Sequence, residues 1–313
     1  MDPRDRPVII PGYLAEGLSR SSEQDASEWL VRLPSIVAAA EVRWGISIGE
    51  PFEPGGATSW VAPARTADGR HVVYKCTFPH PEAIGEADAL ARYDGDGAVR
   101  LFESQPDTYE MLVERCEPGD SLWALEDRAV RLEVAAGLMR RLWRPIAGTE
   151  FGSLALLTTG WAGVTMRRLL TIPAPWVTSP IERGVDLLQT LPHTGEGDDV
   201  LLHQDFHPGN VLTARREPWL VIDPKPIVGD PAFDPVPMLV QDRGGVCEPP
   251  AHAVIESDTS TLAGMLGVDP VRIAMWAIAR CAEWTMWSLE RGHVVDASIT
   301  YTWARSLDAI FPD

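Results

Sequence analysis

One short segment, residues 203–210 with the sequence HQDFHPGN, combines a carboxylate, two amides and two imidazoles. A second carboxylate, Asp223, follows 13 residues after Asn210. Phosphoryl transfer needs one carboxylate to orient the acceptor hydroxyl, and an amide with a second carboxylate to hold Mg²⁺ on the phosphates. Asp205, Asn210 and Asp223 supply this set. The alternative is a turn in which Asp and Asn only cap backbone groups, but the flanking apolar runs predict that both acids stand at strand ends facing one site.

The same segment allows a metal site of another kind. The H-x-D-x-H spacing of His203, Asp205 and His207 would place three zinc ligands on one face of an extended strand. The sequence offers no second cluster of ligands to complete such a site. We therefore expect His203 to orient the loop through hydrogen bonds.

Lysine is scarce in this chain, since only Lys75 and Lys225 among the 27 basic residues are lysines. A GC-rich genome would explain the arginines but not why two positions keep lysine. The ammonium group of lysine is a compact point charge that fits where a planar guanidinium does not. Both lysines are therefore candidates for a functional site.

Lys75 stands in a predicted strand, from which it would bridge the α- and β-phosphates of a nucleotide. Glu86, 11 residues further on, borders the apolar face of a predicted helix and would turn inward to hold Lys75. Glu82, one turn earlier, is the alternative partner. A surface ion pair without a catalytic role is the alternative interpretation.

Lys225 follows Asp223 by two residues, so it would reach a phosphate group or the charge of the transition state. The alternative is a salt bridge with Asp230 or Asp234. We expect these two aspartates, in the run GDPAFD, to brace the loop and cap the following helix rather than to touch the substrate.

Residues 54–59, PGGATS, lie between two predicted strands and are typical of a loop that covers phosphate groups. Gly55 and Gly56 let backbone N–H groups approach an anion, and Thr58 and Ser59 complete the loop. Glycine pairs between strands are also common in ordinary hairpin turns, so the interpretation of this loop depends on Lys75 and Asp205. No G-x-x-x-x-G-K-[ST] run occurs, so a Walker-type nucleotide site is not predicted.

The first part of the chain reads as an antiparallel sheet. The pair Asp68-Gly69 predicts a hairpin between the second and third strands. Helical patterns run from about residue 24 to 45, where Pro34 would divide or kink the helix, and over residues 80–93. The five expected strands span residues 47–52, 60–65, 71–78, 98–104 and 108–115.

After the hinge-like run Glu117-Pro118-Gly119 the chain becomes mostly helical. Long helical patterns span residues 128–143 and 271–292. The only strand candidates are short apolar runs at residues 200–203, 210–214 and 218–223. This is an α+β plan, with a small antiparallel nucleotide-binding lobe at residues 1–115, a larger catalytic and acceptor-binding lobe at residues 116–313, and a cleft between lobes.

Residues 201–235, LLHQDFHPGNVLTARREPWLVIDPKPIVGDPAFDP, closely resemble the catalytic region of aminoglycoside phosphotransferases. The resemblance is to the branch that contains streptomycin 6-phosphotransferases and hydroxyurea phosphotransferases. The runs YDGDGAVRLFE and VERCEPGDSL resemble the same branch, so the similarity covers most of the chain from about residue 40. It implies a protein-kinase-like fold with a small N-terminal β lobe and a larger, mainly helical C-terminal lobe.

By this resemblance Asp205 is the catalytic base. Asn210 and Asp223 would hold magnesium, and Lys75 with Glu86 would secure the phosphates of ATP.

The hinge backbone from Glu114 to Cys116 would, by the same resemblance, receive the adenine ring. The family usually carries glycine before its catalytic aspartate and leucine after it. Gln204 and Phe206 stand there in this chain, and we expect them to narrow the acceptor pocket.

The C-terminal region, residues 241–313, holds 10 acidic residues against 5 arginines. Within it Trp276, Arg280, Glu283 and Trp287 share one face of a predicted helix. Arg280, Glu283 and Trp287 would line a pocket for a polyhydroxylated cation. The alternative is core packing with an internal pair of Arg280 and Glu283.

The composition disfavours several classes of partner. With 45 acidic and 27 basic residues the net charge is −18, which repels nucleic acid and acidic membrane surfaces and attracts cations. The four cysteines stand far apart without a C-x-x-C pair, as is typical of a reducing cytosol. The first ten residues lack the apolar core of a signal peptide. We expect a cytoplasmic protein with no protein partner implied.

Together these patterns predict an ATP- and Mg²⁺-dependent O-phosphotransferase that modifies a small hydroxylated molecule. By the resemblance, the acceptor is a cationic, streptomycin-like aminoglycoside, and its phosphorylation would confer antibiotic resistance. A kinase of another metabolite, such as hydroxyurea, a sugar or an amino alcohol, is the first alternative. A nucleotide-binding protein without transferase activity is disfavoured, because the base, both metal ligands and the lysine are all present.

Overall fold

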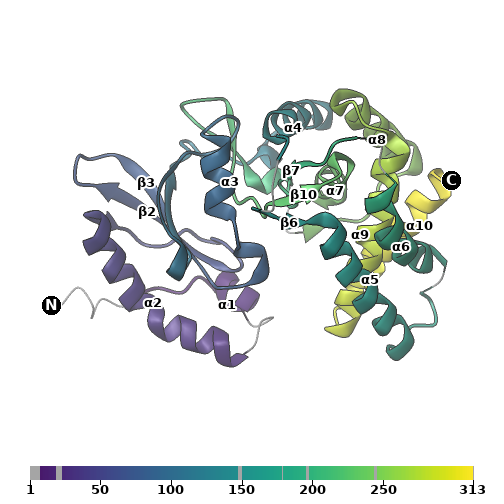
Figure 1. Cartoon of the computed structure of the whole chain (residues 1–313), viewed down its shortest axis with the longest axis horizontal. Coiled ribbons are helices and arrows are strands. Elements are labelled where there is room, and N and C mark those ends of the chain that lie inside the picture. The colour runs from purple at the N-terminus through teal and green to yellow at the C-terminus, as the bar shows by residue number, and fades with distance from the viewer. Residues whose placement is uncertain are drawn as a thin grey trace. The chain divides into compact units, whose positions relative to one another are not determined.

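The computed structural model describes residues 8–18, 23–146, 150–177, 179–194, 197–242 and 245–312. Its contacts divide the chain into two compact units (Figure 1). The first ends at Gly119 and also contains Ala214–Arg216, whereas the second consists of Asp120–Thr213 and the chain from Glu217 onward. Most of the N-terminal segment that was considered as a signal peptide, residues 1–7, lies outside the described residues.

The first unit is built on an antiparallel sheet with the strand order β1-β2-β3-β5-β4. Gly69, at φ +87°, lies in the turn between β2 and β3, so the hairpin predicted at Asp68-Gly69 is confirmed. All five predicted strands are present. They are β1 (Ile46–Ile48), β2 (Ser59–Thr66), β3 (His71–Thr77), β4 (Leu101–Gln105) and β5 (Glu110–Glu114).

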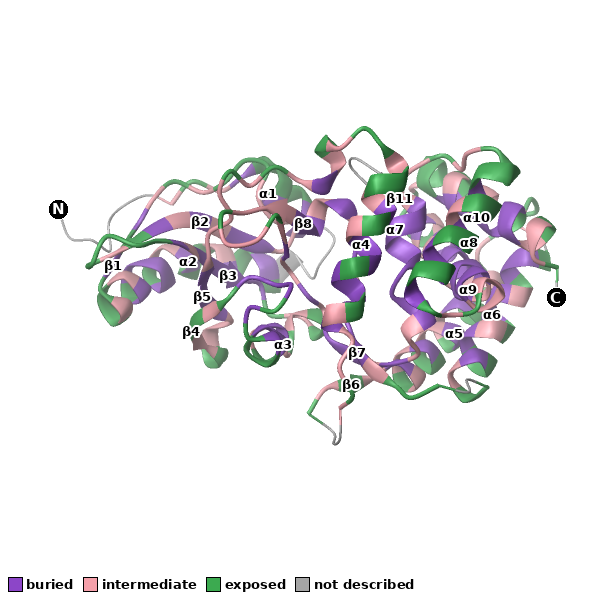
Figure 2. Cartoon of the chain, turned by 90° about the horizontal axis from the view of Figure 1, so that it is seen from above, coloured by how far each residue is buried: buried purple, intermediate pink, exposed green. Residues whose placement is uncertain are grey.

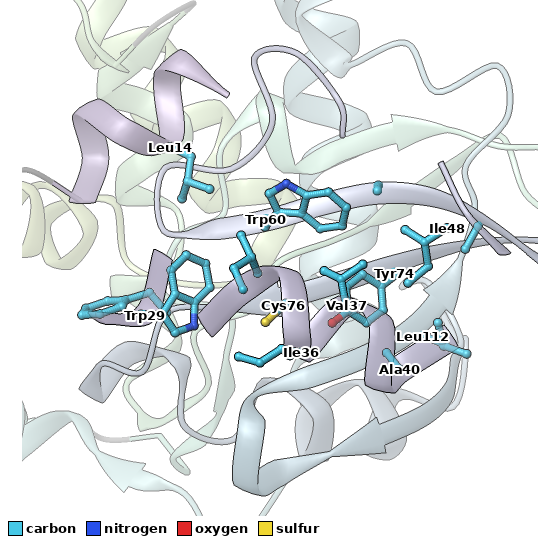
Figure 3. Packing of buried hydrophobic residues seen from close by; sticks show 14 of the residues in the cluster. Leu14, Trp29, Ile36, Val37, Ala40, Ile48, Trp60, Tyr74, Cys76 and Leu112 are labelled. Atoms are coloured by element: carbon cyan, nitrogen blue, oxygen red, sulfur yellow. The ribbon is translucent and has the colours of Figure 1, made fainter. Parts of the chain in front are cut away.

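A long helix, α2 (Glu23–Trp44), packs its apolar face on this sheet. Figure 3 shows Trp29 and Ile36 of α2 in one cluster with Trp60 of β2. Pro34 lies inside α2 without dividing it, so the predicted helix is confirmed but the predicted division is not. A proline removes one backbone hydrogen bond, and burial of the apolar face outweighs that loss.

Two shorter helices complete the first unit. The sequence analysis did not predict α1 (Gly12–Leu18), which adds two buried leucines to the same core. The other helix, α3 (Glu86–Tyr93), begins later than predicted. A 3₁₀ turn at Pro81–Ala83 and Gly85 at φ +87° precede it. A further 3₁₀ turn, Pro106–Thr108, leads into β5.

The second unit is mainly helical, as predicted. Its helices are α4 (Arg128–Leu142), α5 (Leu154–Thr171), α6 (Ser179–Thr190), α7 (Val236–Val240), α8 (His252–Leu266), α9 (Pro270–Glu290) and α10 (Val294–Ile310). Figure 2 shows α9 largely in the colour of buried residues, and α5, α6, α8 and α10 all pack on it. A side chain at Gly184 of α6 would overlap Ala282 of α9, so only glycine allows these helices to approach so closely.

Short strands in the second unit flank residues 203–210, the segment predicted to be catalytic. Of these, β7 (Val200–Leu202), β8 (Val211–Thr213) and β9 (Trp219–Val221) match the three predicted runs. The expectation that these are its only strands is wrong, because two more strands join β7 in a sheet of order β6-β10-β7. Strands of two or three residues are too short to show a readable alternation. The unpredicted strands are β6 (Gly152–Ser153), β10 (Ile227–Gly229), β11 (Gln241–Asp242) and β12 (Gly245–Val246).

No single helix among the described residues is long and apolar enough to cross a membrane. The pair α8 and α9 meets the length and composition criterion when taken together, but the chain bends by 118° between them. Both helices bury many of their residues within the second unit.

Candidate active site

Asp205 lies in the loop after β7, and its carboxylate is paired with the ammonium group of Lys225. The Lys225 Nζ to Asp205 Oδ2 distance is 2.8 Å, and the two side chains are 29% and 22% exposed. Burial raises the pKa of Asp205, but the charge of Lys225 and its hydrogen bond act against it, so this pKa lies well below its usual value. Asp205 is therefore ionised at neutral pH. The sequence suggested Asp230 or Asp234 as the ion-pair partner of Lys225, whereas the structure pairs it with Asp205.

The loop around Asp205 is held by the buried carboxylate of Asp234. Asp234 accepts hydrogen bonds from the backbone N–H groups of His203 and Gln204, at 3.0 and 2.7 Å, and from the Trp143 indole at 3.0 Å. Gln204 has a left-handed backbone with φ +66°, a conformation that costs a residue with a side chain about 1–2 kcal/mol. The hydrogen bonds to Asp234 hold this conformation. The predicted role of Asp234 in bracing the loop is therefore confirmed.

His203 orients the same loop through both ring nitrogens. The Asp205 N–H donates to Nδ1 at 3.3 Å, and Nε2 donates to the carbonyl oxygen of Ile222 at 3.0 Å. Neither nitrogen is left for a metal. Among the described residues no group of three or more His, Cys, Asp and Glu side chains could hold a metal ion. The alternative zinc site of His203, Asp205 and His207 is therefore not supported.

The ring of His207 is fixed between a tryptophan and a backbone amide. It stacks on Trp123, with ring centroids 5.5 Å apart, and its Nδ1 accepts the Gly209 N–H at 3.0 Å. Its Nε2 lies 4.0 Å from Asp205 Oδ2. Burial lowers the pKa of His207, so the ring is neutral at neutral pH. Trp123 was missed in the sequence, because a single tryptophan in the 3₁₀ turn Leu122–Ala124 belongs to no periodic pattern.

Asn210 and Asp223, the predicted metal ligands, lie next to β8 and β9. The amide nitrogen of Asn210 donates to the Asp205 carbonyl at 3.0 Å, which turns its oxygen away and leaves that oxygen as an acceptor. The Ile222 N–H donates to the Asn210 carbonyl at 2.9 Å, so the two segments lie side by side. Asp223 is half-buried at φ +60°, and its charge acts on His207. Amide and carboxylate oxygens suit Mg²⁺, so this donor set fits that ion.

In the first unit, Lys75 of β3 is paired with Glu86, as predicted, and not left at the surface. The Nζ to Oε1 distance is 2.6 Å, and the two side chains are 10% and 5% exposed. Glu86 is the first residue of α3, where a carboxylate also interacts favourably with the positive end of the helix.

The predicted phosphate loop lies between β1 and β2. Gly55 has φ +68°, and side chains at Gly55 and Gly56 would come within 2.8 and 3.0 Å of backbone carbonyl oxygens. The Thr58 carbonyl accepts a backbone hydrogen bond at 2.8 Å from the residue that follows β3. Ser59 departs from the expectation, because it begins β2 and its buried hydroxyl lies 2.9 Å from that of Thr77. Its side chain is not presented to a phosphate.

The segment expected to receive adenine is fixed by an arginine 102 residues away in the sequence. Arg216 Nε donates to both carboxylate oxygens of Glu114, at 3.0 and 3.1 Å, and its terminal nitrogens donate to the carbonyls of Gly95 and Ala98, at 2.7 and 2.9 Å. Burial raises the pKa of the Cys116 thiol to about 12, so this cysteine is neutral. Arg216 was missed because nothing in its own neighbourhood signals so distant a partner.

The charged residues predicted to line an acceptor pocket, Arg280 and Glu283, lie together in a compact cluster. Arg280 lies between the rings of Trp161 and Trp284, with its Cζ 4.1 and 4.4 Å from their centroids. Glu283 is 7% exposed, with Arg280 at 3.2 Å and Arg168 at 3.7 Å from its carboxylate. The internal Arg280–Glu283 pair is thus confirmed, and an acceptor-binding role stays a prediction.

Two other residues of that helical face also have partners within the unit. Trp276 is fully buried, and its indole donates to Asp230 at 2.6 Å. Asp230 in turn caps the 3₁₀ turn Pro231–Phe233. Trp287 is half-buried and stacks against Arg291, whose Cζ lies 4.1 Å from its ring centroid.

Phe206 and Gln204 were expected to narrow the acceptor pocket. Phe206 is fully buried and meets the ring of His203 edge-on, with centroids 5.5 Å apart, so this expectation is wrong for Phe206. Gln204 is only 7% exposed. Both side chains belong to the packing that holds the loop.

The sequence is similar to known kinases along most of its length. A family model described as aminoglycoside/hydroxyurea antibiotic resistance kinase matches residues 43–292. A streptomycin 6-kinase of Streptomyces griseus is 33% identical, over 91% of this chain and 92% of its own length. A hydroxyurea phosphotransferase of Kitasatospora aureofaciens is 35% identical, over 92% of this chain and 82% of its own. The family resemblance noted in the sequence is confirmed.

The fold is similar to that of a thermostable mutant of the aminoglycoside phosphotransferase APH(4)-Ia, solved in a ternary complex with ADP and hygromycin B. The TM-score is 0.58 at 15% sequence identity, and the match covers 88% of this chain and 97% of the other. The predicted protein-kinase-like fold of the aminoglycoside phosphotransferase type is thereby confirmed.

The pairing of Asp205 with Lys225 generates a first prediction. Lys225→Met removes the charge 2.8 Å from Asp205 while keeping an unbranched side chain. Burial then acts on the carboxyl without its main counterion, so the pKa of Asp205 should rise from well below its usual value toward or above that value. Carbon-13 NMR titration of the aspartate carboxyl groups, assigned with Asp205→Asn, measures this. Arg140→Met, which removes an exposed cation of α4, should leave this pKa unchanged. An equal pKa in Lys225→Met and the unmutated protein would contradict the electrostatic assignment.

Proposed function

Because this chain belongs to the aminoglycoside/hydroxyurea antibiotic resistance kinase family and is thus a phosphotransferase, we propose that it transfers the γ-phosphoryl group of ATP to a hydroxyl of a streptomycin-like aminoglycoside. The observation that carries the proposal is the ionised carboxylate of Asp205, paired with Lys225 and hydrogen-bonded through its backbone to Asn210. Phosphoryl transfer requires a charged carboxylate that can bind the acceptor hydroxyl, next to an amide and a second carboxylate that can bind Mg²⁺.

Asp205 orients the acceptor hydroxyl in this proposal. Its low pKa makes it a weak base, so it accepts a hydrogen bond from the hydroxyl first and takes the proton only as the new O–P bond forms. The bond between the γ-phosphorus and the bridging oxygen breaks at the same time, and ADP leaves with that oxygen. The proton on Asp205 is then released to water.

Lys225 has two tasks in this scheme. It keeps Asp205 ionised despite burial, and its ammonium group offers a positive charge to the transferring phosphoryl oxygens. Lysine suits both tasks because a point charge can turn from a carboxylate to a phosphate without the fixed fork of a guanidinium.

Asn210 and Asp223 would hold Mg²⁺ on the phosphates. The ion would neutralise charge on the β- and γ-phosphate oxygens. In the first unit, Lys75 held by Glu86 would bind the α- and β-phosphates, and the backbone N–H groups around Gly55 and Gly56 would cover them.

Hydroxyurea is the second candidate acceptor, because the hydroxyurea phosphotransferase of Kitasatospora aureofaciens is as similar to this chain as the streptomycin 6-kinase. We favour the aminoglycoside because it is cationic and the chain carries a net charge of −18. Hydroxyurea is neutral and gains nothing from this field.

Asp205→Asn tests the base. We expect kcat to fall about 10²-fold or more, because the amide can neither take the proton nor carry the charge. The dissociation constant of ATP, measured by calorimetry, should stay nearly unchanged. Asp269→Asn, which alters only the N-cap of α9, is the control and should retain turnover. Full turnover by Asp205→Asn would exclude Asp205 as the base.

Asp223→Asn tests the metal assignment. Asparagine tolerates the left-handed backbone found at φ +60°, so this change removes charge and leaves the shape of the loop. The Mg²⁺ concentration needed for half-maximal activity should rise about tenfold or more. In the unmutated enzyme activity should follow added Mg²⁺. Stoichiometric zinc in the active protein, or an unchanged Mg²⁺ requirement in Asp223→Asn, would contradict the assignment.

A product screen tests the acceptor. Incubation with ATP, Mg²⁺ and either streptomycin or hydroxyurea, read by mass spectrometry, should show the gain of one phosphoryl group on streptomycin. The KM for streptomycin should rise between low and physiological salt, because attraction to the negative chain is screened over about 8 Å. Phosphorylation of hydroxyurea alone, with a KM independent of salt, would overturn the assignment of an aminoglycoside acceptor. The assignment as a kinase would not be affected.

A further inference from the structure

The N-terminal helix α1 lies directly on the glycine-rich loop. Leu14, Gly17 and Leu18 form its buried face, and the two leucines enter the core beneath β2 and β3. A side-chain carbon at Gly17 would overlap the carbonyl oxygen of Ala57 and lie 2.7 Å from its carbonyl carbon. Glycine is therefore the one residue that lets the helix backbone rest against this part of the loop.

The residues before and at the start of α1 add further contacts with the same region. The indole of Trp60, in β2, donates a hydrogen bond to the carbonyl of Ile9 at 2.8 Å. The ring of Pro11 lies 3.8 Å from where a side-chain carbon would stand at Gly55. Figure 3 shows Leu14 and Trp60 in the same apolar cluster. Residues 9–18 thus contact both the loop and the strand that follows it.

This contact matters because a loop of this composition does not hold its own shape. Gly55 and Gly56 have the widest backbone freedom of any residue type, and ordering such a segment around a ligand lowers affinity. A loop that is already held against a helix loses less freedom on binding. Residues 9–18 also lie outside the matched residues 43–292, so the family model says nothing about them.

We propose that residues 9–18 position the glycine-rich loop for the phosphates of the nucleotide, with Gly17 as the positioning residue. The proposal rests on the proposed function, in which the loop at Gly55 and Gly56 covers those phosphates. Gly17 acts through Ala57 and does not itself touch the nucleotide.

The experiment compares Gly17→Ala with Gly12→Ala in the full chain. Both changes add one methyl group to α1, but a side-chain carbon at Gly12 meets nothing within 4 Å. Dissociation constants for ATP and for adenosine are measured by calorimetry. Gly17→Ala should raise the dissociation constant of ATP about tenfold or more and that of adenosine less than about twofold. The difference is expected because only the phosphate-covering loop moves. Gly12→Ala should change neither.

Two results would overturn the proposal. Unchanged ATP affinity in Gly17→Ala would show that the helix does not set the loop. Equal weakening of ATP and adenosine would show a general disturbance of the unit. A merely structural role for Gly17 would not change the ratio of the two constants.

Gly55→Ala separates this proposal from the proposed function. Its side chain would clash inside the loop itself, at 2.8 Å from the Phe52 carbonyl oxygen, at a residue with φ +68°. Weaker ATP binding in Gly55→Ala but not in Gly17→Ala would overturn the role of α1 alone. Unchanged ATP binding in both would overturn the phosphate-covering role of the loop, and the proposal with it.

Pro11→Ala decides the matter if Gly17→Ala does not fold. It removes ring atoms that face Gly55 and leaves the buried face of α1 intact. A looser loop should raise the dissociation constant of ATP about two- to fivefold and leave that of adenosine unchanged. ATP affinity equal to that of the unmutated protein would overturn the proposal.

Discussion

A largely buried carboxylate that must stay ionised is the constraint on which the loop at residues 203–210 depends. Burial alone would raise the pKa of Asp205 and neutralise it, so Lys225 has to stand within hydrogen-bond distance. The need to keep this pair together constrains the backbone at Lys225 and the backbone of the loop that carries Asp205. The backbone of Lys225 donates to the His203 carbonyl at 3.0 Å, while Asp234 holds the loop at the left-handed Gln204. The strain of the left-handed backbone at Gln204 costs about as much as one hydrogen bond contributes, and several hydrogen bonds around the loop offset it.

The first unit solves the same problem with the charges reversed. Lys75 is 8% exposed and stands between Tyr74 and Cys76, which belong to the core, so its charge needs a fixed partner in Glu86. A buried ion pair adds little to stability compared with an apolar pair of equal size, because desolvation opposes the attraction. Stability alone therefore does not account for the buried pair of Lys75 and Glu86, and a role in the proposed function would explain why this position keeps lysine in a chain that otherwise uses arginine.

The sequence predicted what depends on local pattern. Alternation and an Asp-Gly turn located the five strands around Lys75, and spacing along one helix face paired it with Glu86. Contacts between distant segments left no such trace. Arg216 meets Glu114 across 102 residues, and Gly17 fits Ala57 only because both backbones come together in the fold. The stripe on α9 left two interpretations open for a related reason, since a helical face that turns inward has the same periodicity as one that lines a pocket.

The ion pairs of Asp205 with Lys225 and of Lys75 with Glu86 have little influence on which acceptor is chosen. The charged groups around Glu283 balance one another, since Arg280 pairs with Glu283 within α9 and Arg168 of α5 pairs with Glu283 and Glu290. The excess of acids that gives the chain its charge of −18 therefore lies elsewhere. Scattered surface charge speeds the approach of any cation but distinguishes poorly between cations. Choice among acceptors must then come from the shape and hydrogen bonds of the acceptor pocket, because one fold can serve acceptors of different kinds.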